Sequence, residues 1–387
     1  MFRPTLEQVM AKMWTNSGDS HFIEPEDVWT TRLPKALADL TPKSVKDPDG
    51  EWETVSVDGQ TFRRKLPTSA AAKFIEESNK PQGVRDPRAR LADLDKEGVW
   101  GEVIFPSLGM WASTFRTPEL LKACMHASNL YAIEELVPVS DRYVVTGQIS
   151  TLRVEDAVEE IEWLAENGFK TVFLPTTPHP SAPDWHRNDW EPLWDVCEKA
   201  GIVPAFHIGT DPVDMTSGGA GQVYRGPGGA VMNYTETTFS GQRAAMKMVA
   251  SGALDRHPDL KVLISEGGAT WIPFLGDRLL EGYRQHAVAV RPKLSRDPKE
   301  ILMTQVYASF QHDETAVAAN EAMGYKNVMF GSDYPHMEGT FGHTQKTLAG
   351  LFADAKPETV KRITQGAFYE LFPHVPPVPE STDRIQG

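Results

Sequence analysis

Five residues of types that commonly bind metal ions are spread along this 387-residue chain: Asp19, His21, His207, Glu266 and Asp333. Carboxylates and imidazoles are suitable ligands for zinc, manganese or iron. If the five side chains met, their three carboxylates would repel one another, and a bound cation would remove that conflict. Such a cation would also lower the pKa of a bound water, so that hydroxide becomes available near neutral pH. The set therefore predicts a metal-dependent enzyme, provided that the fold brings these residues together.

Each of these residues alone is a weak signal. A histidine at the end of an apolar strand, such as His207, more often bonds a backbone carbonyl than a metal. An aspartate after a strand, such as Asp333, more often caps the next helix. Asp19 and His21 carry more information, because residues two apart on a strand point to the same side. The combination favours a metal, whereas no single residue does.

Short apolar or β-branched stretches alternate with longer helical stretches, which is typical of βα units around a parallel sheet. The helical pattern is clearest at residues 117–138, 153–167, 189–200, 235–256, 313–324 and 343–355. We predict eight strands, at residues 17–23, 99–106, 143–149, 169–174, 202–207, 260–266, 303–310 and 326–332. This order predicts an α/β fold, a closed (β/α)8 TIM-type barrel that forms a single domain over residues 1–387.

The reactive groups of such barrels lie at the carboxyl ends of the strands. Asp19 and His21 end the first predicted strand, and His207 ends the fifth. Glu266 ends the sixth predicted strand, and Asp333 directly follows the eighth. We therefore expect all five side chains to meet at one mouth of the barrel.

Two insertions interrupt the alternation of strands and helices. The first, at about residues 40–85, lies between strands one and two, and its segment EWETVSVDGQTFRRK predicts a hairpin that turns at Asp58-Gly59. The second, residues 208–234, is a glycine-rich loop after strand five. A lid or binding loop and an ordinary surface loop are equally good interpretations of this second insertion.

Further polar and aromatic residues fall near the predicted mouth. His336 is a candidate proton carrier and His312 a candidate extra ligand, although either could simply line the pocket. Glu24 could orient His21 or bind the metal itself. The candidates for substrate contacts, whose ordinary roles would be core packing or surface pairing, are Trp271, His179, Arg243 and Phe310.

Composition narrows the class of partner. The formal net charge of −14 argues against nucleic acid or an anionic membrane as the main partner. The two cysteines, Cys124 and Cys197, lie far apart and predict reduced thiols. The N-terminal segment contains charge and no long apolar run, which predicts neither a signal peptide nor a membrane anchor. We expect a cytoplasmic protein that acts on a small molecule.

Several segments resemble the amidohydrolase-2 family, which includes aromatic-acid decarboxylases and the aminocarboxymuconate-semialdehyde decarboxylase group. In the family's order, they are DSHFIEP at 19–25, RLADLDKEGV at 90–99, the strand-five His207, SEGGATWIPFLGDRL at 265–279 and GSDYPH at 331–336. The resemblance implies the barrel fold, one or two bound metals and a homodimer. It also implies a set of metal ligands, which are Asp19, His21, His207 and Asp333.

The chain departs from the family pattern at strand six, where the decarboxylases carry a catalytic histidine and this chain has Glu266. A glutamate there could bridge two metals, act as a general base or hold a water. We predict a hydrolase or decarboxylase of a small carboxylated or carbonyl-bearing substrate, with Asp333 as metal ligand and general base. The alternative is a nonheme diiron monooxygenase in which Glu266 bridges two irons. A third interpretation, a catalytically inactive barrel used for binding, is disfavoured by the complete set of ligand-type residues.

Overall fold

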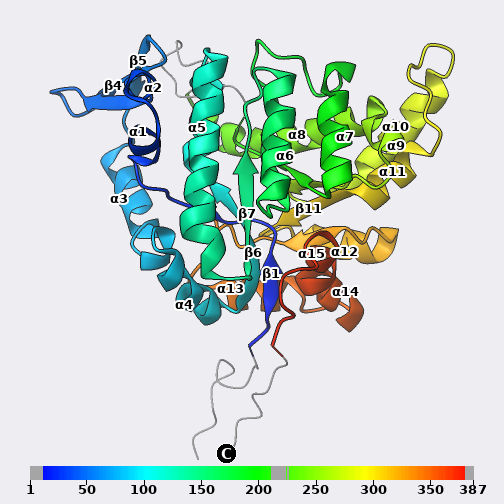
Figure 1. Cartoon of the computed structure of the whole chain (residues 1–387). Coiled ribbons are helices and arrows are strands. Elements are labelled where there is room, and N and C mark those ends of the chain that lie inside the picture. Colours follow the sequence, from blue (N-terminus) through cyan, green and yellow to red (C-terminus); the bar gives the residue numbers. More distant parts are fainter. Residues whose placement is uncertain (1–11, 211–223, 225, 380–387) are drawn as a thin grey trace, which may run out of the picture.

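The computed structural model describes residues 12–210, 224 and 226–379, and its centre is a nearly closed barrel of parallel strands surrounded by helices (Figure 1). Hydrogen-bonded neighbours follow the order β1-β6-β7-β8-β9-β10-β11-β12, and the short strand β2 also pairs with β6. The strands are β1 (Thr15–Ser17), β2 (His21–Phe22), β6 (Val99–Pro106), β7 (Tyr143–Gln148), β8 (Thr171–Pro175), β9 (Val203–His207), β10 (Val262–Ser265), β11 (Val306–Phe310) and β12 (Val328–Phe330). All of these pairings are parallel, so the predicted (β/α)8 barrel is confirmed.

The first strand position is interrupted between β1 and β2, so the continuous strand predicted over residues 17–23 is wrong in its detail. At this point the backbone bonds to the far end of the sheet: the Asp333 N–H donates to the Asp19 carbonyl at 2.9 Å. Ser20 also forms an isolated parallel bridge with Tyr334, just after β12. These contacts join the first and last strands and place Asp19 beside Asp333.

Helices cover the outside of the barrel (Figure 1). They are α4 (Pro87–Glu97), α5 (Pro118–Tyr131), α6 (Val154–Glu166), α7 (Glu191–Ala200), α8 (Gly229–Ala250), α9 (Ala253–Arg256), α10 (Trp271–Gln285), α11 (Pro298–Gln305), α12 (Glu314–Met323), α13 (Thr344–Leu351), α14 (Pro357–Lys361) and α15 (Ala367–Leu371). Within the described part of the chain, no helix combines the length and apolarity that crossing a membrane requires.

Two of the predicted boundaries are wrong for identifiable reasons. The helix predicted at 235–256 begins earlier than expected, at Gly229. It ends at Ala250, because Gly252 adopts a left-handed backbone (φ 77°) that separates α9 from α8. The strand predicted from residue 303 begins at Val306, because α11 continues through Gln305. Asp297 caps α11 by accepting hydrogen bonds from the N–H groups of its first turn.

The first insertion folds into α1 (Val28–Arg32), α2 (Lys35–Ala38), β3 (Lys43–Lys46), β4 (Trp52–Val57), β5 (Gln60–Lys65) and α3 (Ser69–Ser78). The predicted hairpin is confirmed: Asp58 (φ 49°) and Gly59 (φ 70°) both have the positive φ that a tight two-residue turn requires. The third strand, β3, was not predicted because its four residues are all exposed and show no apolar alternation. The Asp58 carboxylate accepts the N–H of Arg116 and of Thr117, at 2.6 and 2.7 Å, which ties the hairpin to the segment before α5.

The second insertion is described only in part. Residues 211–223 and 225 of the predicted 208–234 loop lie outside the described residues. Its last residues, from Gly229 onward, form the first turns of α8. Several of these helical residues line the cavity described below.

Two apolar clusters correspond to the two sides of the strands. On β6, Ile104 packs in the larger cluster, which lies between the strands and the helices, whereas Val103 and Phe105 belong to a smaller cluster. Because alternate residues of a strand point to opposite sides, the smaller cluster fills the barrel interior. Phe368 of α15 and the following Phe372 belong to this interior cluster, so the C-terminal helix packs against the interior of the barrel.

A fully buried ion pair connects α4, the barrel and the site. Arg90 on α4 donates through Nε and Nη2 to the two carboxylate oxygens of Glu102 on β6, at 2.5 and 2.9 Å. Its Nη1 donates to the His21 carbonyl at 2.9 Å, and its guanidinium lies over the Tyr334 ring. One side chain therefore holds both β2 and the segment after β12.

We expect Arg90→Met to destabilise the protein strongly, by about 3–5 kcal/mol, because it leaves Glu102 as a buried charge without a partner. Denaturant unfolding compared with the wild type measures the loss. Arg278→Met is the matched control, since Arg278 pairs with Glu281 in an exposed position and should change stability by less than about 1 kcal/mol. A similar midpoint for the Arg90 variant and the control would contradict the proposed role of the buried pair.

Candidate metal centre

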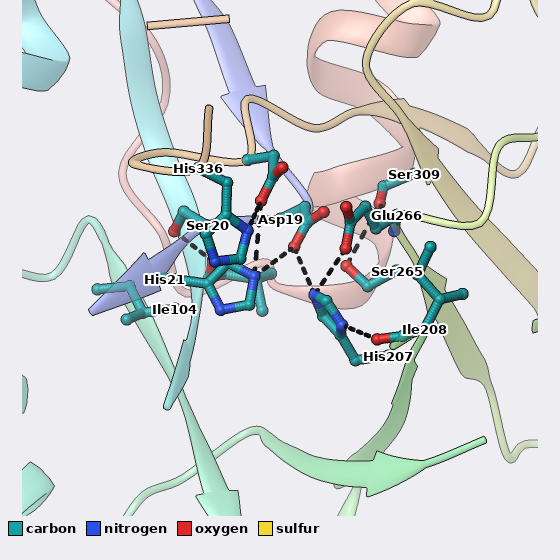
Figure 2. Close-up of polar contacts among 12 residues, drawn as sticks. Asp19, Ser20, His21, Ile104, His207, Ile208, Ser265, Glu266, Ser309 and His336 are labelled. Atoms are coloured by element: carbon teal, nitrogen blue, oxygen red, sulfur yellow. Dashed lines mark hydrogen bonds and ion pairs between the residues drawn. The ribbon is translucent and has the colours of Figure 1, made fainter. Parts of the chain in front are cut away.

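The five predicted ligand-type residues meet at the carboxyl end of the barrel, as expected from their places along the chain. Asp19 lies in the break between β1 and β2, His21 begins β2, and His207 ends β9. Glu266 follows β10, and Asp333 follows β12. Figure 2 shows the labelled side chains of four of them, together with His336, pointing toward one another.

The distances between their polar atoms are short enough for shared coordination. His207 Nε2 lies 3.2 Å from Asp19 Oδ1 and 3.6 Å from Glu266 Oε2. His21 Nε2 lies 3.6 Å from Asp333 Oδ1 and 3.8 Å from Asp19 Oδ1. Asp19, His21 and His207 are all buried, and each offers one ligand atom within 4.8 Å of the others.

Four buried polar atoms in this group have no hydrogen-bond partner in the described part of the chain: Asp19 Oδ2, His21 Nε2 and both carboxylate oxygens of Asp333, of which Oδ1 makes only an ion-pair contact with His336. Buried polar atoms without partners are costly, so their concentration at one point needs an explanation. His207 is oriented in a way that fits: its Nδ1 donates to the Ile208 carbonyl at 2.7 Å, which leaves the Nε2 lone pair facing the carboxylates. A divalent cation would satisfy all of these atoms, so the residues present fit a metal.

The backbone at two of the site residues is in the left-handed region. Glu266 has φ 62° and Asp333 has φ 52°, which is uncommon for residues other than glycine and is typical of functional sites. The Glu266 N–H donates to Ser309 Oγ at 3.0 Å, and the Ser265 hydroxyl donates to the Gly18 carbonyl at 2.9 Å. These bonds hold the turn after β10 so that the Glu266 side chain faces the site.

The electrostatics of the site reflect burial and crowding of like charges. Burial raises the pKa of Glu266 well above its ordinary value, and the carboxylates of Asp333 and Asp19 raise it further. Burial likewise raises the pKa of Asp333 to about 6. Burial lowers the pKa of His21, which keeps this imidazole neutral. For His207, burial alone would lower the pKa, but the Asp19 carboxylate raises it overall.

Metal binding should therefore depend on pH. The raised pKa values of Glu266 and Asp333 mean that the folded protein holds these protons above the pH at which the unfolded chain releases them. In metal-free protein, these carboxyl groups contribute less stability as pH rises from about 4 through about 6 and beyond. A cation must displace the same protons, so its affinity rises with pH.

We expect the apparent affinity for Mn²⁺ to be about tenfold or more higher at pH 7.5 than at pH 5.5, because carboxyl protons compete with the metal. Calorimetric titration of metal-free protein at the two pH values measures the difference. Equal affinities would show that the carboxyl groups are already ionised in the metal-free site.

A cavity of about 320 Å³ opens above these residues, a size within the usual range for small-molecule sites. Phe105 and Phe173 form apolar walls, and His207 lies against both rings. Residues of its lining that the sequence analysis did not identify include Tyr234, Thr237 and Thr238 on α8, and Gln311 and Glu338 beyond β11 and β12. The spacing of Tyr234 and Thr238, one helical turn apart, is the signal that could have identified them, had α8 been predicted to begin before residue 235.

Of the additional predicted residues, His336 lies at the site and His312 lies apart from it. His336 Nδ1 is 2.8 Å from Asp333 Oδ1, and its side chain is 42 % exposed at the cavity. His312 Nε2 instead lies 3.0 Å from the Glu338 carbonyl oxygen, and its ring stacks on His343. His312 therefore does not join the groups of side chains that could hold a metal in the described residues.

Glu24 lies behind the site. Its Oε2 accepts the N–H groups of Ser107 and Leu108, at 3.0 and 3.2 Å, which anchors the loop after β6. Burial raises the pKa of Glu24 to about 7. The carboxylate thus orients the loop that lines the cavity, a different task from the predicted orientation of His21.

None of the four predicted substrate-contact residues is among the described residues that line the main cavity. Phe310 is fully buried in the outer apolar cluster, and Trp271 Nε1 donates to the carbonyls of Gly267 and Gly268. Arg243 is exposed on α8. His179 lines a second, smaller cavity beside the main one.

Comparison with known proteins places this geometry in a family. A 2-amino-3-carboxymuconate-6-semialdehyde decarboxylase from Dictyostelium discoideum is 24% identical over 257 residues, 65% of this chain and 67% of that protein. An amidohydrolase from Mycobacterium avium subsp. paratuberculosis K-10 superposes with a TM-score of 0.73 at 20% identity, covering 94% of this chain and 98% of the other.

A 5-carboxyvanillate decarboxylase from Novosphingobium aromaticivorans, whose structure holds manganese and 4-hydroxy-3-methoxy-5-nitrobenzoic acid, superposes with a TM-score of 0.65 at 16% identity. That match covers 93% of this chain and 96% of the other. The sequence profile of the amidohydrolase family matches residues 102–372, more than half of the chain. The chain therefore belongs to the amidohydrolase family.

Proposed function

We propose that this protein is a metal-dependent decarboxylase of a small, carboxylated aromatic or unsaturated substrate. The observation that carries the proposal is the set of buried, unpartnered oxygen and nitrogen atoms of Asp19, His21 and Asp333 at the base of a cavity with aromatic walls. The related decarboxylases, one of them with bound manganese, support the same reaction. They give the diiron monooxygenase alternative no support.

The residues that would hold the metal are Asp19, His21, His207 and Asp333. When bound, a divalent ion such as manganese or zinc would offset the carboxylate charges of the site and polarise a substrate carboxylate. His207 is held for this task by its Nδ1 bond to the Ile208 carbonyl, which fixes the ring tautomer. The fully buried Arg90 supports His21 through its backbone carbonyl.

The cavity walls suit a flat, partly apolar substrate. Phe105 and Phe173 lie with their ring centroids 6.0 Å apart in an edge-to-face arrangement on one side of the cavity. Tyr234 and Thr238 on α8 face the cavity from another element. These side chains would exclude water from the substrate carbon that loses carbon dioxide. That carbon would then take its proton from a group of the site and not from bulk water.

Decarboxylation breaks a carbon–carbon bond and forms a carbon–hydrogen bond, so the site must deliver a proton to that carbon. Glu266 lies in the cavity wall with its side chain only 13% exposed, and it stands where the decarboxylases of the family carry a histidine. His336 reaches solvent and contacts Asp333, which makes it the route by which a proton returns from water. We assign Glu266 the transfer of the proton and His336 its resupply.

The test is release of carbon dioxide from a panel of hydroxylated benzoates and unsaturated amino acids by protein loaded with Mn²⁺. The proposal predicts release that is abolished by a chelator and restored by added metal. Hydrolysis of an ester or amide panel without any release of carbon dioxide would contradict it, and would point to the hydrolase chemistry of the same family.

A further inference from the structure

A second, smaller cavity opens beside the main one and shares two wall residues with it, Phe173 and Thr210. Its volume is about 30 Å³, enough for one or two groups the size of a water molecule. Half of the residues that line it are polar: Ser113, Gln148, Thr151, Thr177, His179 and Thr210. The small cavity is thus a polar extension of the proposed substrate site.

Gln148 places an unused hydrogen-bond acceptor in this extension. It is the last residue of β7, is 3% exposed, and its Oε1 has no hydrogen-bond partner in the described part of the chain. Its backbone is fixed from both sides by Asn129: Asn129 Nδ2 donates to the Gln148 carbonyl at 2.7 Å, and the Gln148 N–H donates to Asn129 Oδ1 at 2.8 Å. A buried acceptor held this firmly and left unpaired is costly unless a ligand supplies the donor.

The loop after β6 keeps this space open. A Cβ atom added at Gly109 would lie 2.9 Å from Phe173 Cε1 and 3.1 Å from Gln148 Oε1, so a larger residue would crowd both side chains. Phe173 is also the register partner of Gln148 across β7 and β8. The three residues therefore meet at the junction of the two cavities.

His179 complements the acceptor with a donor. Its Nδ1 accepts the Ser181 N–H at 3.1 Å, so the proton of the neutral ring lies on Nε2. Burial and the nearby Arg116 lower the pKa of His179, which favours that neutral form. Besides the hydroxyl groups of its serine and threonine residues, the small cavity thus has an acceptor on Gln148 and a donor on His179, a pairing that a hydroxyl group can satisfy.

We propose that this small cavity binds a hydroxyl or amino substituent of the substrate, with Gln148 Oε1 accepting its hydrogen bond. The inference rests on the proposed function, because the carboxylate of the same molecule would lie at the metal centre. It assigns Gln148 to substrate specificity: the protein selects carboxylated substrates that carry a hydrogen-bond donor and rejects analogues without one, since these leave the buried oxygen unpaired.

The test is calorimetric binding of benzoate and its three monohydroxy isomers to manganese-loaded protein. We expect at least one hydroxybenzoate to bind the wild type about tenfold more tightly than benzoate, as one buried hydrogen bond implies. Gln148→Leu should remove that preference, because no buried acceptor remains to distinguish a hydroxybenzoate from benzoate. Gln311→Leu, a matched change in the wall of the main cavity, should keep the preference.

Three results would overturn the inference: a preference retained by Gln148→Leu, equal binding of all four acids by the wild type, or binding of none of them. Circular dichroism of each variant verifies that the barrel is folded. Release of carbon dioxide is measured separately. If no carbon dioxide is released but the preference still depends on Gln148, the decarboxylase assignment is refuted. The role of Gln148 in binding a substrate hydroxyl or amino group is then still supported.

Discussion

Replacing His207 with alanine is expected to remove most of the bound metal while the barrel remains folded. His207 contributes an oriented imidazole 3.2 Å from Asp19 and 3.6 Å from Glu266, and its loss leaves the carboxylates of the site without a neutral ligand between them. Mutation of a residue that only orients a metal ligand typically weakens metal binding by about 10- to 100-fold. Loss of a direct ligand should therefore weaken it by more than about 100-fold. Metal per chain after dialysis against a defined free concentration of Mn²⁺ measures the change.

The matched control is His312→Ala. His312 also follows a barrel strand, but its ring lies beside the Glu338 carbonyl and His343, away from the groups that could hold a metal. Metal content should therefore stay near that of the wild type. If the two variants bind equal amounts of metal, His207 does not belong to the site.

Glu266→Gln is expected to keep the fold and reduce turnover per bound metal by about 10²–10⁴-fold. Glutamine has nearly the same shape, so the packing and the left-handed turn at this residue persist. What it lacks is a proton that can be transferred, and general acid–base catalysis contributes a factor of this size. Rates of carbon dioxide release, divided by the metal content of each sample, separate catalysis from metal loss.

The control for this prediction is Glu338→Gln, a carboxylate in the wall of the same cavity that we do not assign to proton transfer. Its rate per bound metal should fall by less than about tenfold. A rate near that of the wild type for the Glu266 variant would mean that this side chain only fills space, and the proton would have to come from elsewhere.

The barrel and its mouth are predictable from the sequence because they depend on local signals. Short β-branched stretches predict the strands, and the carboxyl ends of parallel strands must share one end of a barrel. His207 and Glu266 are therefore predicted to lie together from their places in the chain alone, and the structure brings them within 3.6 Å. The shared location of the five ligand-type residues could therefore be predicted without knowing how the loops fold.

The remainder of the site depends on contacts between distant segments, which local patterns do not encode. The break at Asp19 exists because its carbonyl accepts the Asp333 N–H, a bond between residues at opposite ends of the barrel sequence. The sequence suggests that Glu24 orients His21 or binds the metal, yet its carboxylate accepts N–H groups from the loop at Ser107. Both outcomes are set by tertiary hydrogen bonds.

Tyr234 illustrates a second reason for missed residues. Glycines around 226–229 indicate a loop, but Gly228 in a left-handed conformation is the residue that precedes the first turn of α8. The helix therefore starts before its apolar periodicity becomes visible, and Tyr234 faces the cavity from its first turns. Prediction of cavity walls requires helix boundaries that propensity alone does not locate.

The most direct test of the central claim is the metal content of protein purified without chelator and without added metal. The account predicts about one manganese or zinc ion per chain, because Asp19, His21, His207 and Asp333 are proposed to hold one ion together. It also predicts that the ion is lost in His207→Ala and kept in His312→Ala. Protein without bound metal that also fails to take up Mn²⁺, or protein that holds two irons per chain, would contradict it.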